Sequence, residues 1–160
     1  MWHEVECGRV ALAEFVEHMG LILGPQLPHD HKARGLTASD FDPFADVQPI
    51  PTMIELAEEI KSYGIRTAIL TNNVREWRQW RDRIPMELFD PIIDSCEVGL
   101  RKPDHAIYSL TCERMGLAPN DCLFLDDHPG NVAAALAVGL DALEVGEDFE
   151  AVARTVRDRL

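Results

Sequence analysis

The chain is short of basic residues and has no long apolar run. Its 160 residues include 15 Lys and Arg against 28 Asp and Glu, a formal net charge of −13. A field of this sign repels phosphate polymers, which argues against nucleic acid and anionic membranes as partners. No window approaches about 18 uninterrupted apolar residues, so no membrane span is expected. Because the first nine residues resemble no signal peptide, we expect a cytoplasmic protein.

Cysteine is scarce and forms no recognisable motif. Cys7, Cys96, Cys112 and Cys122 are widely spaced, without a CxxC or zinc-like pattern. The spacing therefore favours reduced, buried thiols over a disulfide framework or a cysteine-bound metal.

What is present is the composition of a folded domain, with 46% hydrophobic and 27% charged residues. Apolar spacing predicts a helix over residues 10–23, followed by a polar, proline-broken segment up to residue 46. From residue 49 the pattern becomes regular and begins with a predicted helix over 51–63. We therefore predict two parts, residues 1–46 and residues 47–160.

The second part alternates between two kinds of segment. Four short apolar runs predict strands, and amphipathic stretches between and after them predict helices. Such alternation predicts an α/β fold, a Rossmann-like, mainly parallel sheet with right-handed crossovers. The predicted strands are 65–70, 91–94, 122–125 and 142–145, and the predicted helices are 74–83, 103–115, 131–138 and 149–160.

Polar residues follow the predicted strands, where ligands bind in folds of this class. Thr71 and Asn72 follow the first strand, Lys102 follows the second after a short loop, and Asp126 and Asp127 follow the third. A hydroxyl and nearby N–H groups suit phosphate oxygens, and an ammonium suits phosphate or a developing oxyanion. Two adjacent carboxylates suit a hard cation such as Mg²⁺.

Each motif also has a purely structural interpretation. Asn73 can cap a helix, Lys102 can be a solvated loop lysine, and the two aspartates can form a turn. Three strand-end motifs in this order are more specific than any one of them. Together they favour a phosphate and Mg²⁺ site at one edge of the sheet.

These motifs resemble those of the haloacid dehalogenase-like (HAD) hydrolase superfamily. Residues 68–73, 97–104 and 124–131 are similar to its second, third and fourth motifs, and residues 1–15 resemble part of a helical cap. The similarity is to the cap-bearing branch that includes the phosphatase domain of bifunctional epoxide hydrolases. The resemblance implies a HAD core at 47–160 with a partial cap at 1–46.

The resemblance also implies roles for single residues. Thr71, Asn72 and Lys102 bind the phosphate of a small phosphorylated substrate, and Thr71 and Lys102 take part in catalysis. Asp126 is a Mg²⁺ ligand, with Asp127 as a ligand or support. The implied reaction is Mg²⁺-dependent hydrolysis through an aspartyl-phosphate. The carboxylate pair argues against a true dehalogenase, because in this family that chemistry needs no metal.

The first family motif, a strand ending in Asp-x-Asp, has no match in the chain. Asp40-Phe41-Asp42 follows no apolar run and is interpreted as a loop or helix start. We therefore expect an incomplete chain that is inactive alone. The family strand is central, between those ending at Thr71 and Asp126. Either these two strands pair directly, or another chain fills the gap by self-association, or the chain is poorly folded. The alternative is a non-catalytic phosphate-binding or interaction protein.

Overall fold

The computed structural model describes residues 1–41, 43 and 47–160. The short strands lie between helices, as the sequence predicts. The α-helices are α1 (Trp2–Glu6), α2 (Leu12–Leu23), α3 (Pro51–Ser62), α4 (Ser95–Val98), α5 (His105–Met115), α6 (Pro129–Val138) and α7 (Phe149–Arg157). The strands are β1 (Ile69–Thr71), β2 (Ile92–Asp94), β3 (Leu123–Asp126) and β4 (Asp141–Glu144), and the longest 3-10 segment is η4 (Arg75–Arg83).

The sheet is divided into two parallel pairs. β1 pairs with β2, with Ile69 opposite Ile92, and β3 pairs with β4, with Leu123 opposite Asp141. Within the described residues, no ladder joins β1 to β3. The α/β class with parallel strands is confirmed, and β1 and β3 do not pair directly.

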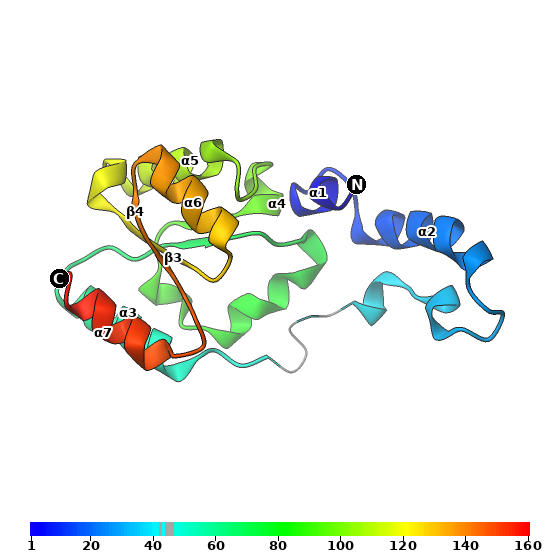
Figure 1. The fold of residues 1–160 in the computed structure, drawn as a ribbon, viewed down its shortest axis with the longest axis horizontal. Helices are drawn as coiled ribbons and strands as arrows, with labels where there is room; N and C mark the ends of the chain where they lie inside the picture. The colour runs from blue at the N-terminus through cyan, green and yellow to red at the C-terminus, as the bar shows by residue number, and fades with distance from the viewer. Residues whose placement is uncertain (42, 44–46) are drawn as a thin grey trace.

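Helices cover both faces of the strands, as parallel strands require. Figure 1 shows α5 and α6 on one side and α3 and α7 on the other. Tyr108 of α5 and Ala135 of α6 are fully buried over Phe124 and Ala142. On the other face, Leu56 of α3 and the apolar side of α7 pack on a second set of strand side chains, Leu123, Leu125 and Leu143.

The edge of β1 away from β2 faces the division. Ile69 donates its backbone N–H to Pro91, so the polar groups of Ile69 face β2. Because backbone groups alternate in direction along a strand, those of Leu70 face the opposite edge. The Leu70 carbonyl there accepts a hydrogen bond from a side chain, Lys102, instead of a strand.

β3 has a corresponding open edge. The carbonyls of Cys122 and Asp126 accept hydrogen bonds from segment 141–145. Alternation then directs the backbone groups of Leu123 and Leu125 away from β4. Both strand pairs therefore expose an unpaired ladder edge, which is a template for another strand.

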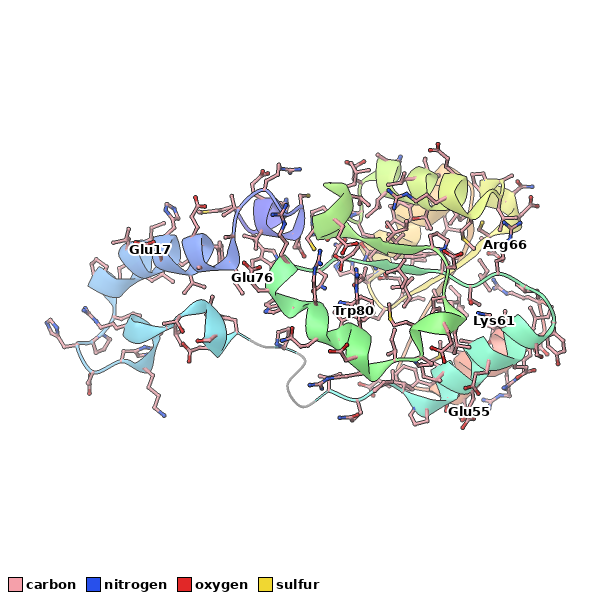
Figure 2. All side chains as sticks on the ribbon, turned by 180° about the vertical axis from the view of Figure 1, so that it is seen from behind. Glu17, Glu55, Lys61, Arg66, Glu76 and Trp80 are labelled. Carbon is pink, nitrogen blue, oxygen red and sulfur yellow. The ribbon has the colours of Figure 1, made fainter. Side chains whose placement is uncertain are left out.

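The N-terminal helices pack on the end of β2 and on η4. Ser95 donates its hydroxyl to the Glu6 carbonyl at 2.6 Å, and the ring centroids of Trp2 and Trp77 lie 5.8 Å apart. Figure 2 shows Glu76 at this junction, where its carboxylate accepts the Leu12 N–H at 3.0 Å. The predicted boundary between residues 46 and 47 adjoins undescribed residues and stays a prediction.

Several predicted boundaries were wrong. β1 begins at Ile69 instead of residue 65, residues 75–83 form 3-10 turns instead of an α-helix, and α1 was missed. A kink at Trp77, with φ −104° and ψ 29°, interrupts the helical path. Other boundaries move by a few residues at either end, which is the ordinary uncertainty of helix and strand ends. No described helix is long and apolar enough to cross a membrane.

Candidate active site

Lys102 lies at the division between the two strand pairs. Its ammonium donates to the Leu70 carbonyl of β1 at 2.9 Å and to Asp126 Oδ2 of β3 at 2.6 Å. It also lies 5.6 Å from the centre of the Phe124 ring, within range of a cation–π attraction. The residue is only 9% exposed. The interpretation of Lys102 as a solvated loop lysine is therefore wrong.

Asn72 holds the backbone of Lys102. Its side-chain amide donates to the Lys102 carbonyl at 2.9 Å, and its oxygen accepts the Lys102 N–H at 2.8 Å. This reciprocal pair fixes the start of the Lys102 side chain against the end of β1. The hydrogen bonds assign the Asn72 side chain to positioning Lys102, and leave its predicted contact with phosphate as a prediction.

Asp126 ends β3 and is buried, with both carboxylate oxygens engaged. Oδ2 accepts from Lys102, and Oδ1 accepts the His128 N–H at 2.9 Å and the Asn131 amide at 2.8 Å. Asn131 was missed as a site residue, although a polar residue in the first turn of the following helix was a usable signal. These donors orient the carboxylate toward Lys102.

Burial raises the pKa of the Asp126 carboxyl, but the Lys102 hydrogen bond and charge lower it by more, helped by Asn131 and His128. The pKa of Asp126 therefore lies below the ordinary value for an aspartate, and Asp126 is ionised at neutral pH. Tyr108 lies under the same site and donates its hydroxyl to the Asn131 carbonyl at 3.0 Å. Burial, and then the charge of Asp126, raise the pKa of Tyr108 to about 12.

The remaining predicted site residues differ in exposure. Thr71 is half-buried at the end of β1, between Leu70 and Asn72, both of which contact Lys102. Asp127 is exposed and adjacent to Asp126. The structure therefore brings Thr71, Asn72, Lys102 and Asp126 to one edge, with Asp127 at its solvent side.

A second polar cluster, at the end of β2, was not predicted. Asp94 is fully buried and accepts from the Asn73 amide at 3.3 Å and from Arg81 at 3.2 Å. The Asn73 N–H donates to the Ser95 hydroxyl at 2.9 Å. Asn73 is thus a buried link between β1 and β2, and the helix-cap interpretation of Asn73 is wrong.

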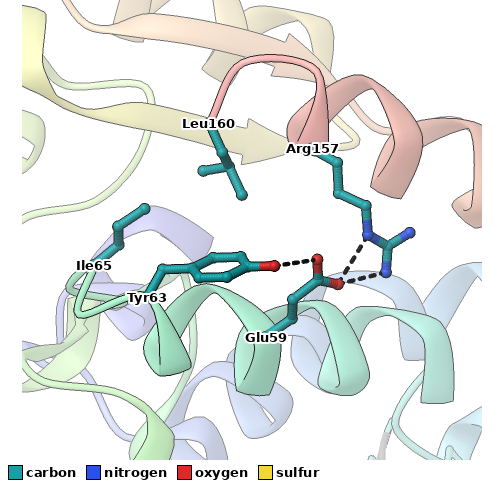
Figure 3. A pocket seen from close by; sticks show the side chains of 5 residues that line it. All are labelled: Glu59, Tyr63, Ile65, Arg157 and Leu160. Atoms are coloured by element: carbon teal, nitrogen blue, oxygen red, sulfur yellow. Dashed lines mark hydrogen bonds and ion pairs between the residues drawn. The ribbon is translucent and has the colours of Figure 1, made fainter.

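A surface hollow near the C-terminus is lined by none of these residues. It has a volume of about 480 Å³ and lies between the C-terminal ends of α3 and α7. Figure 3 shows Glu59 there, bonded to Arg157 at 2.8 Å and to the Tyr63 hydroxyl at 3.4 Å. The Glu59 carboxylate and the Arg157 guanidinium therefore pair with each other in this hollow.

The carboxylates of Asp126 and Asp127 suit one Mg²⁺ ion but supply only part of its ligand shell. The described residues contain no group of three or more His, Cys, Asp or Glu side chains arranged for a metal. Mg²⁺ commonly needs only one or two carboxylates, with water and substrate phosphate completing its shell. Asp126 Oδ2 has one donor, so a lone pair remains on it, and Asp127 is exposed.

Comparison with known proteins shows which family the chain belongs to. A family model for haloacid dehalogenase-like hydrolases matches residues 11–139. The chain is 31% identical over 106 residues to bifunctional epoxide hydrolase 2 of Rattus norvegicus, covering 62% of this chain and 19% of that protein. It is 27% identical over 150 residues to the sesquiterpene phosphatase astK of Aspergillus oryzae, covering 92% and 74%.

A solved structure shows the same fold. A HAD family enzyme of Bacteroides thetaiotaomicron, in complex with magnesium and inorganic phosphate, overlays with a TM-score of 0.69 at 18% identity, covering 93% of this chain and 77% of that one. The family model spans most of the chain, so the chain belongs to the haloacid dehalogenase-like hydrolase family. The chain spans about a fifth of the length of the rat epoxide hydrolase.

The buried Lys102–Asp126 pair predicts a specific pH dependence. The pKa of Asp126 is lower in the folded state than in the unfolded chain, so its contribution to stability is complete above about pH 5 and is lost as the pH falls through the folded value. Asp126→Asn should reduce the free energy of unfolding at neutral pH by about 2–4 kcal/mol. The difference from wild type should shrink in acid, as denaturant titrations at several pH values would measure.

Asp127→Asn is the matched control, because it removes the same charge from the exposed neighbour. It should leave the free energy of unfolding within about 0.5 kcal/mol of wild type at neutral pH. A wild type and an Asp126→Asn variant whose stabilities fall in parallel with pH would contradict the assignment.

Proposed function

We propose that this site serves Mg²⁺-dependent hydrolysis of a small phosphate ester. The observation that carries the proposal is the buried Lys102 ammonium, held by both strand pairs next to Thr71 and Asp126. A fixed cation at a strand-end edge suits a phosphate group and the negative charge that develops on it. The phosphatase names of relatives and the magnesium and phosphate bound by the B. thetaiotaomicron enzyme support the same class.

Each residue has a part set by its position. Lys102 attracts the phosphate and stabilises its charge, while Asn72 keeps the Lys102 backbone in place. Thr71 donates its hydroxyl to a phosphate oxygen. Asp126, oriented by Asn131, holds the Lys102 ammonium at the edge. We favour a phosphatase over a dehalogenase because two adjacent carboxylates suit a hard cation.

Asp126 and Asp127 are the residues that would hold Mg²⁺. When bound, the ion would neutralise phosphate charge and polarise the phosphorus–oxygen bonds. The net charge of the two aspartates and Lys102 is −1, which attracts a cation and repels an anion. Cation and phosphate are therefore expected to bind more tightly together than separately.

The attacking group of the family mechanism is an aspartate that forms an aspartyl-phosphate. The described strands end in Thr71, Asp94, Asp126 and Glu144, and none of them carries Asp-x-Asp there. Asp40 lies in a 3-10 turn, where its carboxylate accepts the Thr37 N–H, while Asp42 lies outside the described residues. We therefore assign phosphate binding and charge stabilisation, but not nucleophilic attack, to this chain.

The first prediction concerns phosphate binding by the 160-residue chain. Inorganic phosphate should bind, as measured by isothermal titration calorimetry, and Mg²⁺ should tighten that binding. Lys102→Met should weaken phosphate affinity at least about tenfold, because a charged hydrogen bond is lost. Asp127→Asn should reduce the effect of Mg²⁺ while leaving phosphate binding without metal intact or slightly stronger.

Lys102→Met leaves Asp126 buried without its cation and can therefore unfold the protein. The double variant Lys102→Met, Asp126→Asn removes the unpaired charge and serves as the folded control. If this double variant binds phosphate as tightly as wild type, Lys102 is not a phosphate ligand.

The second prediction concerns turnover. The chain alone should hydrolyse p-nitrophenyl phosphate no faster than background with Mg²⁺ present, because no described strand supplies the attacking carboxylate. Release of p-nitrophenol can be followed by absorbance. Robust Mg²⁺-dependent activity that disappears in Asp126→Ala would show that this chain contains a nucleophile we have not assigned.

A second candidate function is interaction through the open strand edges, in a protein without catalysis. The outward backbone groups of Leu70, Leu123 and Leu125 have no strand partner in the described structure. Parallel strands are normally paired and covered, so an open edge is expected to associate with another chain. We propose that a second copy of the chain occupies these edges in solution.

Self-association should therefore increase with concentration in analytical ultracentrifugation. Leu125→Pro removes the N–H that faces the open edge and leaves the hydrogen bonds to β4 in place, so it should weaken association. Leu125→Ala keeps that N–H and is the matched control. A monomer at all concentrations, or equal association of the proline and alanine variants, would contradict this candidate.

A further inference from the structure

Two of the four cysteines, Cys112 and Cys122, lie together where α5 turns back into β3. Their Sγ atoms are 3.9 Å apart, and both thiols are free in the structure. Turn hydrogen bonds bring them together, from the Leu117 N–H to the Cys112 carbonyl and from the Cys122 N–H to the Pro119 carbonyl. A short movement of either side chain brings the sulfurs within bonding distance.

The two thiols differ in access. Cys112 is 3% exposed and belongs to the core beneath α5 and α6, whereas Cys122 is half-buried just before β3. An accessible thiol backed by a buried one is the arrangement of an attacking and a resolving cysteine. Cys7, which follows α1, and Cys96, within α4, are also free and are buried.

The surroundings of Cys122 govern how readily it reacts. Burial, and then Cys112 and Asp121, raise its pKa to about 11, while the Arg66 charge opposes them. The Arg66 guanidinium donates to the Met115 carbonyl at the end of α5, and Figure 2 shows its side chain beside that helix end. The thiolate is therefore a minor form at neutral pH, so oxidation is slow and accelerates as the pH rises.

We propose that Cys112 and Cys122 form a reversible dithiol–disulfide site that a low-molecular-weight disulfide such as glutathione disulfide oxidises. The Cys122 thiolate attacks one sulfur of glutathione disulfide, whose S–S bond breaks and releases one glutathione thiolate. Cys112 then loses its proton, attacks the Cys122 sulfur of the mixed disulfide and releases the second glutathione. Two protein thiols become one disulfide, and one glutathione disulfide becomes two glutathiones.

The test is intact-mass measurement and peptide mapping after incubation with excess glutathione disulfide, followed by denaturing alkylation. Wild type should lose two hydrogen atoms and yield a peptide in which Cys112 is joined to Cys122. Cys112→Ser should instead retain one glutathione on Cys122, and Cys122→Ser should leave Cys112 unmodified. Cys96→Ser is the matched control and should form the same link as wild type. Reaction rates should increase with pH.

Three results would overturn the proposal. Wild type that keeps a glutathione on Cys122 would show that Cys112 does not resolve it. Wild type that remains fully reduced would show that the pair does not react. A link that involves Cys7 or Cys96 would show that proximity in the native fold does not determine the pairing. If a serine variant unfolds, the wild-type peptide map alone decides between these results.

Discussion

The ammonium of Lys102 holds together the two halves of an otherwise divided sheet. It reaches the Leu70 carbonyl on one open edge and Asp126 at the end of the other strand pair. Removing a charge from water is expensive, and an isolated ammonium at this depth is unfavourable. The position is stable only because a backbone carbonyl, a carboxylate and the Phe124 ring all face the same nitrogen.

That arrangement makes the site and the fold interdependent. Asn72 and Asn131 fix the two ends of the Lys102–Asp126 pair, and Tyr108 ties Asn131 to α5. Each of these groups also satisfies a buried polar atom, so loss of one partner leaves another unpaired. The same side chains that prepare a positive centre for an anion therefore connect β1 to β3 across the division.

Much of this fold was predictable from periodicity. Apolar runs located all four strands within a few residues, and the Gly139 backbone, with a φ of +100°, ends α6 where the sequence indicated. The late start of β1 was not predictable, because strand pairing depends on neighbours that no local pattern contains. Within η4, Arg78 and Arg81 pair with Glu97, a contact far along the chain that no local pattern contains.

The candidate site was predicted as a set of residues but not as a network. The rule that parallel strands end at one edge brought Thr71, Lys102 and Asp126 together. It contained no information on which groups bond to one another, so the use of the Asn72 amide on the Lys102 backbone was missed. Nor did it indicate Asn131, whose role depends on where α6 begins relative to Asp126.

Charge balance links these observations to ligand binding in an acidic protein. Two carboxylates and one ammonium leave the edge with a charge of −1, within a chain of net charge −13. A phosphate dianion alone would add repulsion, and a divalent cation alone would compete with Lys102 for Asp126 Oδ2. Bound together, they add no net charge, and the anion gives Lys102 and the cation a shared partner. The acidic surface attracts the cation and repels the phosphate, so a bound cation offsets the repulsion that the phosphate alone would meet.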